Sequence, residues 1–309
     1  MALHRANLPQ TTSDVFLAYV GMETDLIFTQ SIDLPGFASY PLLETEEGRE
    51  LLRRYFREVM AVARASGLGV ILESPTWVAS RDRAEPLGYT PDQLDRLNTE
   101  AIALMAEVRQ AEGDLPTVIS ANVGPRDDAY APSEQMDAKE AERYHAAQMA
   151  TLAKTDADLI SAYTLAYPAE AIGIVRAAQK HNLPVIVSFT VETDGRLPTG
   201  TSLKEAIELV DSETEGYASY YMVNCAHPDH LAAPLEDTSR MPRLKGIIAN
   251  ASRCSHAELD EATELDAGNP EELGQQLADI RRSHPQISIL GGCCGTDMRH
   301  MTHIAQNVS

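Results

Sequence analysis

The chain alternates short apolar segments with longer amphipathic ones, and this alternation limits the folds open to it more than any other feature. Each short segment is rich in β-branched residues and is followed by a turn, which is typical of a strand buried on both faces of a parallel sheet. The expected strands are residues 14–20, 69–74, 117–122, 158–163, 184–190, 220–224, 245–250 and 287–292. Taken alone, any one of these runs would also suit a short buried helix.

The segments between these strands have the length and charge pattern of surface helices. Two of them carry start signals, because Thr90 precedes Pro91 and Asn269 precedes Pro270, which places a capping side chain before a proline in the first turn. The expected helices are residues 45–66, 91–111, 137–154, 168–181, 202–212 and 270–283. The segment 226–243 is short and interrupted by prolines, which disfavours a regular helix there.

Eight strand–helix units in 309 residues, with no long linker, predict the α/β class and a (β/α)8 TIM barrel. We expect one domain that covers residues 1–309. A doubly wound open sheet is the alternative. No GxGxxG or GxxxxGK[ST] motif follows an expected strand, and this favours the barrel.

Charge and hydropathy exclude several classes of binding partner. The chain has 25 Lys and Arg against 46 Asp and Glu, a net charge of -21, so nucleic acid and anionic lipid are not expected to bind it. It contains neither a run of 18 apolar residues nor a secretory signal at its start, so we expect no membrane insertion and a cytoplasmic location. The oligomeric state stays open, with a homo-oligomer among the options.

Three of the four cysteines follow expected strands. Cys225 follows the sixth strand, and Cys293 and Cys294 follow the eighth. Active-site residues of barrels lie where the strands end, so these thiols can converge at the barrel mouth. A reducing compartment disfavours disulfides, whereas three thiolates with an open fourth position suit a catalytic Zn²⁺. Burial as a small apolar side chain is the alternative for any one of them.

The glycines around the cysteine pair strengthen the metal hypothesis. Gly291, Gly292 and Gly295 are expected to take positive φ angles, which adjacent cysteines need if both are to reach one ion. Cys254 lies in a polar loop beyond the seventh strand and is interpreted as a bystander. Histidines near both cysteine motifs have no evident carboxylate partner in the sequence, so they rank below the cysteines as ligands.

Two motifs, VNCAHP and GGCCGTD, make the chain resemble the homocysteine S-methyltransferase family of zinc-dependent (β/α)8 barrels. The resemblance spans nearly the whole chain. The motifs that carry it are residues 223–228 and 291–297, supported by 21–28, 122–125 and 187–200. It implies that Cys225, Cys293 and Cys294 hold Zn²⁺ and that a thiol acceptor joins them.

The resemblance also implies the reaction. A methyl group would move from a sulfonium or ammonium donor to a zinc-bound thiol, either homocysteine, giving methionine, or a related thiol or selenol. Zinc ligation removes the proton of a thiol whose ordinary pKa is about 8.5, which prepares the nucleophile at neutral pH. The expected partners are therefore a small-molecule thiol and a methyl donor, and the sequence does not identify the donor.

The chain departs from the family pattern at two positions. Tyr19 and Val20 stand where the family usually has an Asp-Gly pair, and Tyr163 stands where a Glu contacts the homocysteine amino group. Loss of both carboxylates removes charge-assisted hydrogen bonds worth roughly 1.5–3 kcal/mol each. The acceptor is then another thiol or selenol, or homocysteine held differently, with Glu23 or Glu73 as the substitute carboxylate.

The remaining candidates lie beside the expected strand ends. Trp77, the only tryptophan, can face a cationic methyl donor or pack under a loop. Asn122 opens the NVGP motif, and Asn224 precedes Cys225, where it either orients a ligand or caps a strand end. Asp194 and Thr199 lie in TDGRLPTG, which turn formation explains as well as substrate binding does.

Two other functions compete with methyl transfer. A metal-assisted hydrolase or lyase would use zinc-bound water, but three thiolates make zinc less electrophilic towards water. A non-catalytic zinc-binding or thiol-binding barrel would keep the metal site and lose the amino-acid pocket. The two tyrosine replacements keep this second alternative open.

Overall fold

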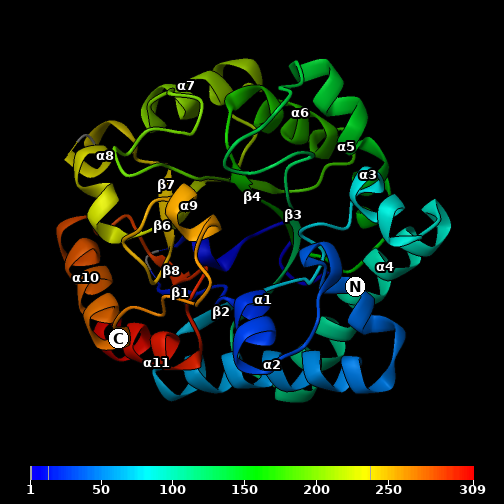
Figure 1. Cartoon of the computed structure of the whole chain (residues 1–309), viewed down its shortest axis with the longest axis horizontal. Helices are drawn as coiled ribbons and strands as arrows, with labels where there is room; N and C mark the ends of the chain where they lie inside the picture. The colour runs from blue at the N-terminus through cyan, green and yellow to red at the C-terminus, as the bar shows by residue number, and fades with distance from the viewer. Residues whose placement is uncertain (1, 13, 237) are drawn as a thin grey trace.

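The computed structural model describes residues 2–12, 14–236 and 238–309. Eight parallel strands close into a barrel in the order of the sequence, with β1 paired to both β2 and β8 (Figure 1). The strands are β1 (Phe16–Leu17), β2 (Gly69–Glu73), β3 (Thr117–Val123), β4 (Leu159–Leu165), β5 (Val185–Phe189), β6 (Tyr221–Ala226), β7 (Leu244–Ala249) and β8 (Ile289–Gly292). The (β/α)8 prediction is confirmed, and the open sheet is excluded because the ladder closes.

Helices surround the barrel (Figure 1). The long ones are α2 (Glu46–Ala65), α4 (Pro91–Glu112), α5 (Ala138–Leu152), α6 (Pro168–Gln179), α7 (Leu203–Glu213), α10 (Pro270–Ser283) and α11 (Met298–Val308). The short ones are α1 (Met22–Thr24), α3 (Arg81–Ala84), α8 (Ala232–Glu236) and α9 (His256–Asp260). The six expected helices occur within two residues of their predicted ends, whereas α11 was not predicted.

The start signals act as expected. The Thr90 side chain accepts from the backbone N–H of Gln93, and the Gln93 side chain accepts from the backbone N–H of Thr90. The Asn269 side chain accepts from the N–H groups of Glu271 and Glu272. Between β6 and β7 the described residues form α8 and two short 3-10 turns, in line with the prolines there.

The apolar core has two layers because each strand buries both faces. Inside the barrel, every strand contributes at least one large apolar side chain to a single cluster. These side chains are Phe16, Ile71, Val118, Leu159, Ile186, Met222, Ile248 and Ile289. The second layer lies between the strands and the helices. Burial on both sides is the physical reason for the continuous apolar runs in the sequence.

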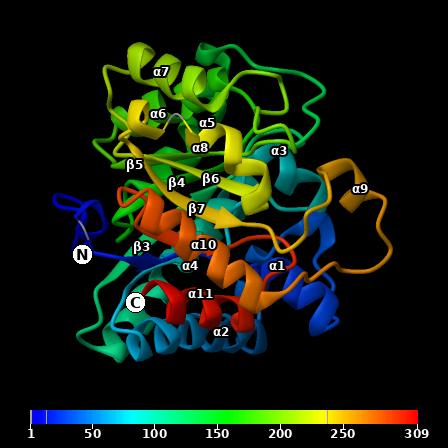
Figure 2. The ribbon, with the colours of Figure 1, turned by 90° about the vertical axis from the view of Figure 1, so that its left-hand side faces the viewer.

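The N-terminal segment closes the end of the barrel opposite α9 (Figure 2). The backbone N–H groups of Leu3 and His4 donate to Asp158 Oδ1 over 2.7 and 2.8 Å, and Arg109 donates to Asp158 Oδ2 over 2.6 Å. Leu8 packs against the inner cluster. The open mouth is therefore at the carboxyl ends of the strands. No helix among the described residues combines the length and the hydrophobicity that a membrane span requires.

Candidate functional site

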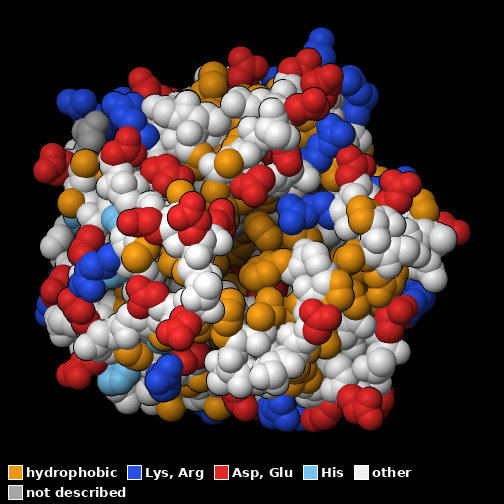
Figure 3. Space-filling view, viewed as in Figure 1, with side chains coloured by type: hydrophobic (Ala, Val, Ile, Leu, Met, Phe, Trp, Pro, Cys, Tyr) orange, Lys and Arg blue, Asp and Glu red, His pale blue; other side chains and the backbone are white. Residues whose placement is uncertain are grey.

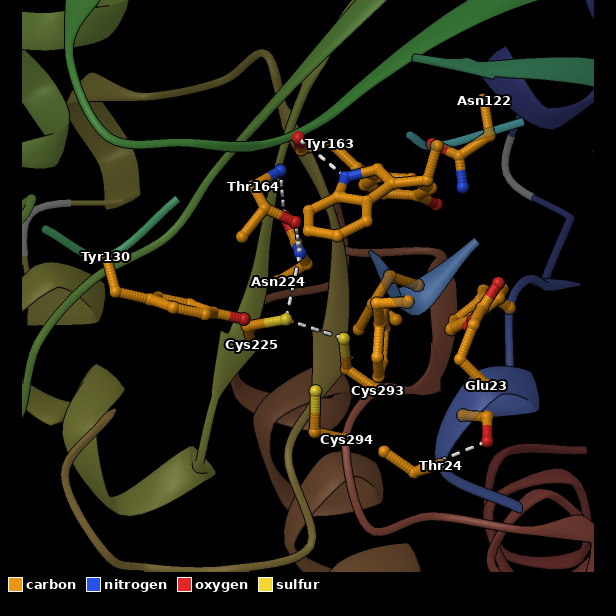
Figure 4. Close-up of a pocket in the computed structure, with 15 residues that line it drawn as sticks. Glu23, Thr24, Asn122, Tyr130, Tyr163, Thr164, Asn224, Cys225, Cys293 and Cys294 are labelled. Carbon is orange, nitrogen blue, oxygen red and sulfur yellow. Dashed lines mark hydrogen bonds between the residues drawn. The ribbon is translucent and has the colours of Figure 1, made fainter. Parts of the chain in front are cut away.

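The structure brings together the three cysteines that the sequence singled out. The sulfur atoms of Cys225 and Cys293 lie 2.6 Å apart, and the Cys294 sulfur completes a group whose members lie within 4.8 Å of one another (Figure 4). Cys225 and Cys293 are buried, Cys294 is partly exposed, and Cys254 is exposed and outside the group. The group lies at the mouth because β6 and β8 both end there.

A break in the strand pairing directs Cys225 towards the other sulfurs. Cys225 has a φ of 54°, and the register between β6 and β7 shifts between Asn224 and Ala226. A left-handed non-glycine residue costs about 1–2 kcal/mol, so surrounding contacts must hold it. Asn224 supplies part of that support, since its Nδ2 donates to the Cys225 sulfur over 3.3 Å. Bulges beside active sites commonly redirect a side chain in this way.

The glycines around the cysteine pair act differently from the prediction. Gly295 has a φ of +78°, as expected, but Gly291 and Gly292 do not take positive φ, so the prediction is wrong for these two. They are needed for close packing instead. A Cβ on Gly291 would lie 2.4 Å from the Tyr19 carbonyl oxygen, and one on Gly292 would lie 2.4 Å from Thr296 Oγ1.

The three sulfurs share protons unequally. Hydrogen bonds from the Cys293 and Cys294 thiols hold the pKa of Cys225 well below its ordinary value. The same proximity raises the pKa of Cys293 well above its ordinary value. The group therefore holds one negative charge readily and further charge only beside a cation. Three buried sulfur donors this close together are a ligand set for a soft or borderline metal ion.

A cavity at the barrel mouth adjoins the sulfurs. Figure 3 shows it as a hollow near the centre of the barrel mouth, with hydrophobic side chains inside and acidic and basic side chains at its rim. All six predicted substrate residues line it, namely Tyr19, Glu23, Trp77, Asn122, Tyr163 and Asn224. Sequence reasoning missed six others: Gly21, Thr24, Phe37, Tyr130, Thr164 and Ile248. None of the described lining residues is Lys, Arg or His.

Glu23 is the carboxylate of this cavity. Its Oε1 accepts from the Ser39 hydroxyl over 2.7 Å and its Oε2 accepts from the Tyr19 hydroxyl. Burial raises the pKa of Glu23 to about 7. Each carboxylate oxygen thus has a hydroxyl donor that fixes its direction, while the side chain remains part of the cavity wall (Figure 4).

Glu73 lies behind the wall rather than in it. Its Oε1 accepts from Ser161 Oγ over 2.9 Å and from the Tyr163 hydroxyl over 3.1 Å, and it is not among the lining residues. Burial raises its pKa to about 7. Of the two substitute carboxylates that the sequence offered, only Glu23 can therefore contact a molecule in the cavity directly.

Trp77 both lines the cavity and packs under a loop, so both sequence interpretations of it describe part of its setting. Its indole N–H donates to the Tyr163 carbonyl over 3.3 Å, and its ring meets Phe37 edge-on with centroids 6.2 Å apart. The Arg83 guanidinium lies 5.4 Å from the indole centroid. These contacts hold the ring in place at the cavity wall.

The other sequence candidates lie outside the cavity lining. Asp194 accepts from the Arg196 N–H, which supports the turn interpretation for this residue. Thr199 donates to the carbonyl of Ala166, which follows β4, so it joins two loops. Contrary to the sequence interpretation, two of the histidines near the cysteine motifs do have carboxylate neighbours. His227 lies 3.4 Å from Asp229, and His300 lies 3.0 Å from Asp297. Sequence reasoning missed His256, which contacts the backbone of Cys225.

Comparisons with known proteins identify a family and a related fold. A family model described as homocysteine S-methyltransferase matches residues 18–308. The metallated form of the homocysteine methyltransferase MmuM from Escherichia coli has a TM-score of 0.74 and 16% identity, and the match covers 97% of this chain and 98% of that one. The oxidised form gives the same score and identity, with 98% and 99% covered. At this identity the likeness shows the fold. No curated protein sequence matches the chain.

Proposed function

The chain belongs to the homocysteine S-methyltransferase family, and from this premise we propose that it is a zinc-dependent S-methyltransferase. It would move a methyl group from a sulfonium or ammonium donor to homocysteine or a related thiol or selenol. Cys225, Cys293 and Cys294 are the proposed Zn²⁺ ligands. The observation that carries the proposal is that three sulfurs within 4.8 Å of one another lie at the wall of the aromatic cavity.

The donor set fits zinc by its chemistry. Catalytic zinc sites use three protein ligands and leave a fourth position free, and thiolates suit this borderline-soft ion. When bound, the ion supplies the positive charge that lets an incoming thiol lose its proton at neutral pH. One of the similar E. coli structures is described as metallated, which supports a metal-binding role for these cysteines.

The cavity wall suits a methylated cation. Trp77, Tyr130 and Tyr163 present aromatic rings, and the described lining contains no basic side chain that would repel the donor. A cation against such a ring gains about 0.5–2 kcal/mol. A wider space adjoins the cavity and is lined by Asp128, Asp260, Glu264 and Asp266 together with Arg83. Its net negative charge favours the entry of positive charge.

Methyl transfer involves no proton transfer to carbon, so the protein contributes mainly by positioning the two reactants. The new bond joins the acceptor sulfur to the methyl carbon, while the bond from that carbon to the donor's sulfur or nitrogen breaks and leaves its electron pair on a neutral product. The acceptor thiol's proton goes to solvent. Holding the two reactants in line is therefore the main contribution of the buried wall.

We assign Glu23 as the partner of an acceptor ammonium. It is the carboxylate of the described cavity lining, and the Tyr19 and Ser39 hydroxyls fix its direction. A charge-assisted hydrogen bond to an ammonium contributes roughly 1.5–3 kcal/mol. Glu73 has a supporting role, because its contact is with the hydroxyl of Tyr163 and not with the cavity.

The test is turnover by the zinc-loaded protein. Homocysteine is incubated with S-methylmethionine, S-adenosylmethionine or betaine in turn, and methionine is measured by mass spectrometry. Cys293→Ala should lose both zinc and activity, whereas Cys254→Ala, which removes an exposed thiol outside the group, should keep both. Methionine formation by Cys293→Ala protein stripped of metal would refute the proposed mechanism.

A non-catalytic zinc-binding or thiol-binding barrel is the second candidate. The observation that favours it is that the hydroxyls of both Tyr19 and Tyr163 are bound to carboxylates, which leaves the cavity with one carboxylate for an amino-acid ligand. Tight zinc binding without methyl transfer to any thiol tested would support this candidate. A zinc hydrolase or lyase gains no support, because the described metal-ligand group contains only sulfur.

A further inference from the structure

The backbone carbonyl of Cys225 is held by a side chain from another loop. His256 Nε2 lies 2.7 Å from this carbonyl oxygen, and Nδ1 of the same ring lies 2.9 Å from Glu192 Oε1. His256 is the first residue of α9, and Glu192 follows β5. The ring is buried and spans two oxygen acceptors, so its orientation is fixed at both ends.

Cys225 needs such a contact because of its backbone conformation. At this residue φ is 54° and the pairing of β6 with β7 slips by one position. After the slip, Asn250 N–H pairs with the carbonyl of Ala226 and not with that of Cys225. The Cys225 carbonyl would then be a buried acceptor outside the strand ladder, and His256 is the donor that satisfies it.

The same imidazole ring also packs against Tyr130, whose hydroxyl faces the Cys225 sulfur. The two rings stack with centroids 4.0 Å apart and planes inclined by 29°. The Tyr130 hydroxyl faces the Cys225 sulfur from the loop that follows β3 (Figure 4). The contact set thus joins the loops after β3, β5 and β7 around a single cysteine.

We infer that Glu192 and His256 form a positioning pair that holds Cys225 in the conformation needed for metal binding. The pair acts through the Cys225 backbone and through Tyr130, and it does not itself touch the other two sulfurs. The inference rests on the proposed function only in taking Cys225 as a metal ligand. Residues that orient metal ligands commonly change metal affinity by about 10- to 100-fold when they are replaced.

The measurement is the affinity of the purified full-length chain for Co²⁺ and Zn²⁺, obtained by chelator competition, together with the Co²⁺ absorption spectrum. His256→Ala should bind both ions about 10- to 100-fold more weakly and should shift the cobalt bands. His256→Gln keeps an N–H that can reach the carbonyl, so it should recover most of the loss. Glu192→Ala should weaken binding, whereas Glu192→Gln keeps an acceptor for Nδ1 and should bind like the wild type.

His300 provides the matched control. It is buried, its Nε2 lies 2.8 Å from the Ala267 carbonyl oxygen, and its Nδ1 lies 3.0 Å from Asp297 Oδ1 and 3.1 Å from the Asp297 backbone N. It therefore also joins a backbone carbonyl to an acidic residue, but the carbonyl belongs to a residue that carries no sulfur. His300→Ala should therefore lose stability without losing metal affinity or altering the cobalt bands. Equal losses of metal affinity in His256→Ala and His300→Ala would overturn the inference.

The remaining outcomes also decide the matter. A His256→Ala protein that binds cobalt as tightly as the wild type, with the same bands, overturns the inference, and so does a wild-type chain that binds neither ion. If His256→Ala does not fold, as judged by circular dichroism, the affinities of Glu192→Ala and His256→Gln decide in its place. A wild-type chain that binds cobalt through sulfur but transfers no methyl group refutes the proposed function, and the variant affinities still test the pair.

Discussion

Replacing Asn224 with alanine tests how the barrel core supports the sulfur group. The Asn224 side chain is buried and makes four hydrogen bonds. Its Oδ1 accepts from the Thr164 N–H over 3.0 Å and from the Ser188 hydroxyl over 2.7 Å. Its Nδ2 donates to Thr164 Oγ1 over 2.8 Å and to the Cys225 sulfur over 3.3 Å. Thr164 has a φ of 64° and Cys225 has a φ of 54°. The Asn224 amide therefore supports two residues in the left-handed conformation, one on β4 and one on β6.

The expected loss of stability comes from the buried donors that alanine would leave without an acceptor. The Thr164 N–H and the Ser188 hydroxyl are both buried, and each would lose its acceptor. A buried donor without a partner costs about 1–3 kcal/mol, and the hydroxyl can rotate to reduce its share. We therefore expect the free energy of unfolding to fall by about 2–4 kcal/mol, measured by equilibrium unfolding in guanidinium chloride.

Asn122→Ala is the control, because it removes the same side-chain atoms from a residue whose side chain makes few hydrogen bonds. Asn122 is buried in the same cavity wall, and its Oδ1 has no hydrogen-bond partner among the described residues. It should lose less than about 1 kcal/mol. Equal losses in the two alanine variants would refute the reasoning. Asn224→Asp keeps an acceptor for the Thr164 N–H and the Ser188 hydroxyl but loses the donor to the Cys225 sulfur and buries a carboxyl group, so it should also lose stability.

Three further predictions test other parts of the structure. Burial raises the pKa of Glu73 from 4.5 to about 7, so the stabilisation from its proton is complete below pH 4.5 and is lost as the pH rises through 7. Relative to Glu73→Gln, the wild type should lose roughly 3 kcal/mol across this window in urea titrations, and parallel pH profiles would contradict the assignment. Asp158→Ala should cost about 3–5 kcal/mol in the same titrations because it leaves the Arg109 guanidinium buried without its partner, and adding Arg109→Leu should recover part of that loss. Trp77→Ala should raise the KM for a cationic methyl donor about 2- to 30-fold and leave the KM for the thiol unchanged, whereas an equal rise in both values would point to a collapsed cavity.

The strands were predictable because burial on both faces leaves a continuous apolar run for each one. The helices were predictable where a capping residue and a proline stood together, as at Thr90 and Asn269. The helix α11 escaped notice because its capping box uses His300 in the place where Glu or Gln is usual. Its start also lies directly after the cysteine motif, where the residues invite a chemical interpretation rather than a structural one.

The candidate site was predictable only as far as strand ends determine positions. Cys225, Cys293 and Cys294 were expected to meet because all three follow strands of one barrel. The sequence could not show whether Glu23 or Glu73 contacts a ligand in the cavity. The answer depends on whether the tyrosine hydroxyl that binds each carboxylate holds it in the cavity wall or behind it. In the structure Tyr163 engages Glu73 behind the wall, while Tyr19 engages Glu23 within it.

The contacts around Cys225 explain why periodicity alone cannot define such a site. Its sulfur is directed by a register shift, and that shift is stabilised by His256 and Tyr130, which come from loops with no repeating pattern. Tyr130 also lines the cavity, so one side chain belongs both to the wall that would face a methyl donor and to the support of a sulfur ligand. A change in the loop after β3 should therefore alter donor binding and metal affinity together. Loops after other strands that touch only the wall should alter donor binding alone.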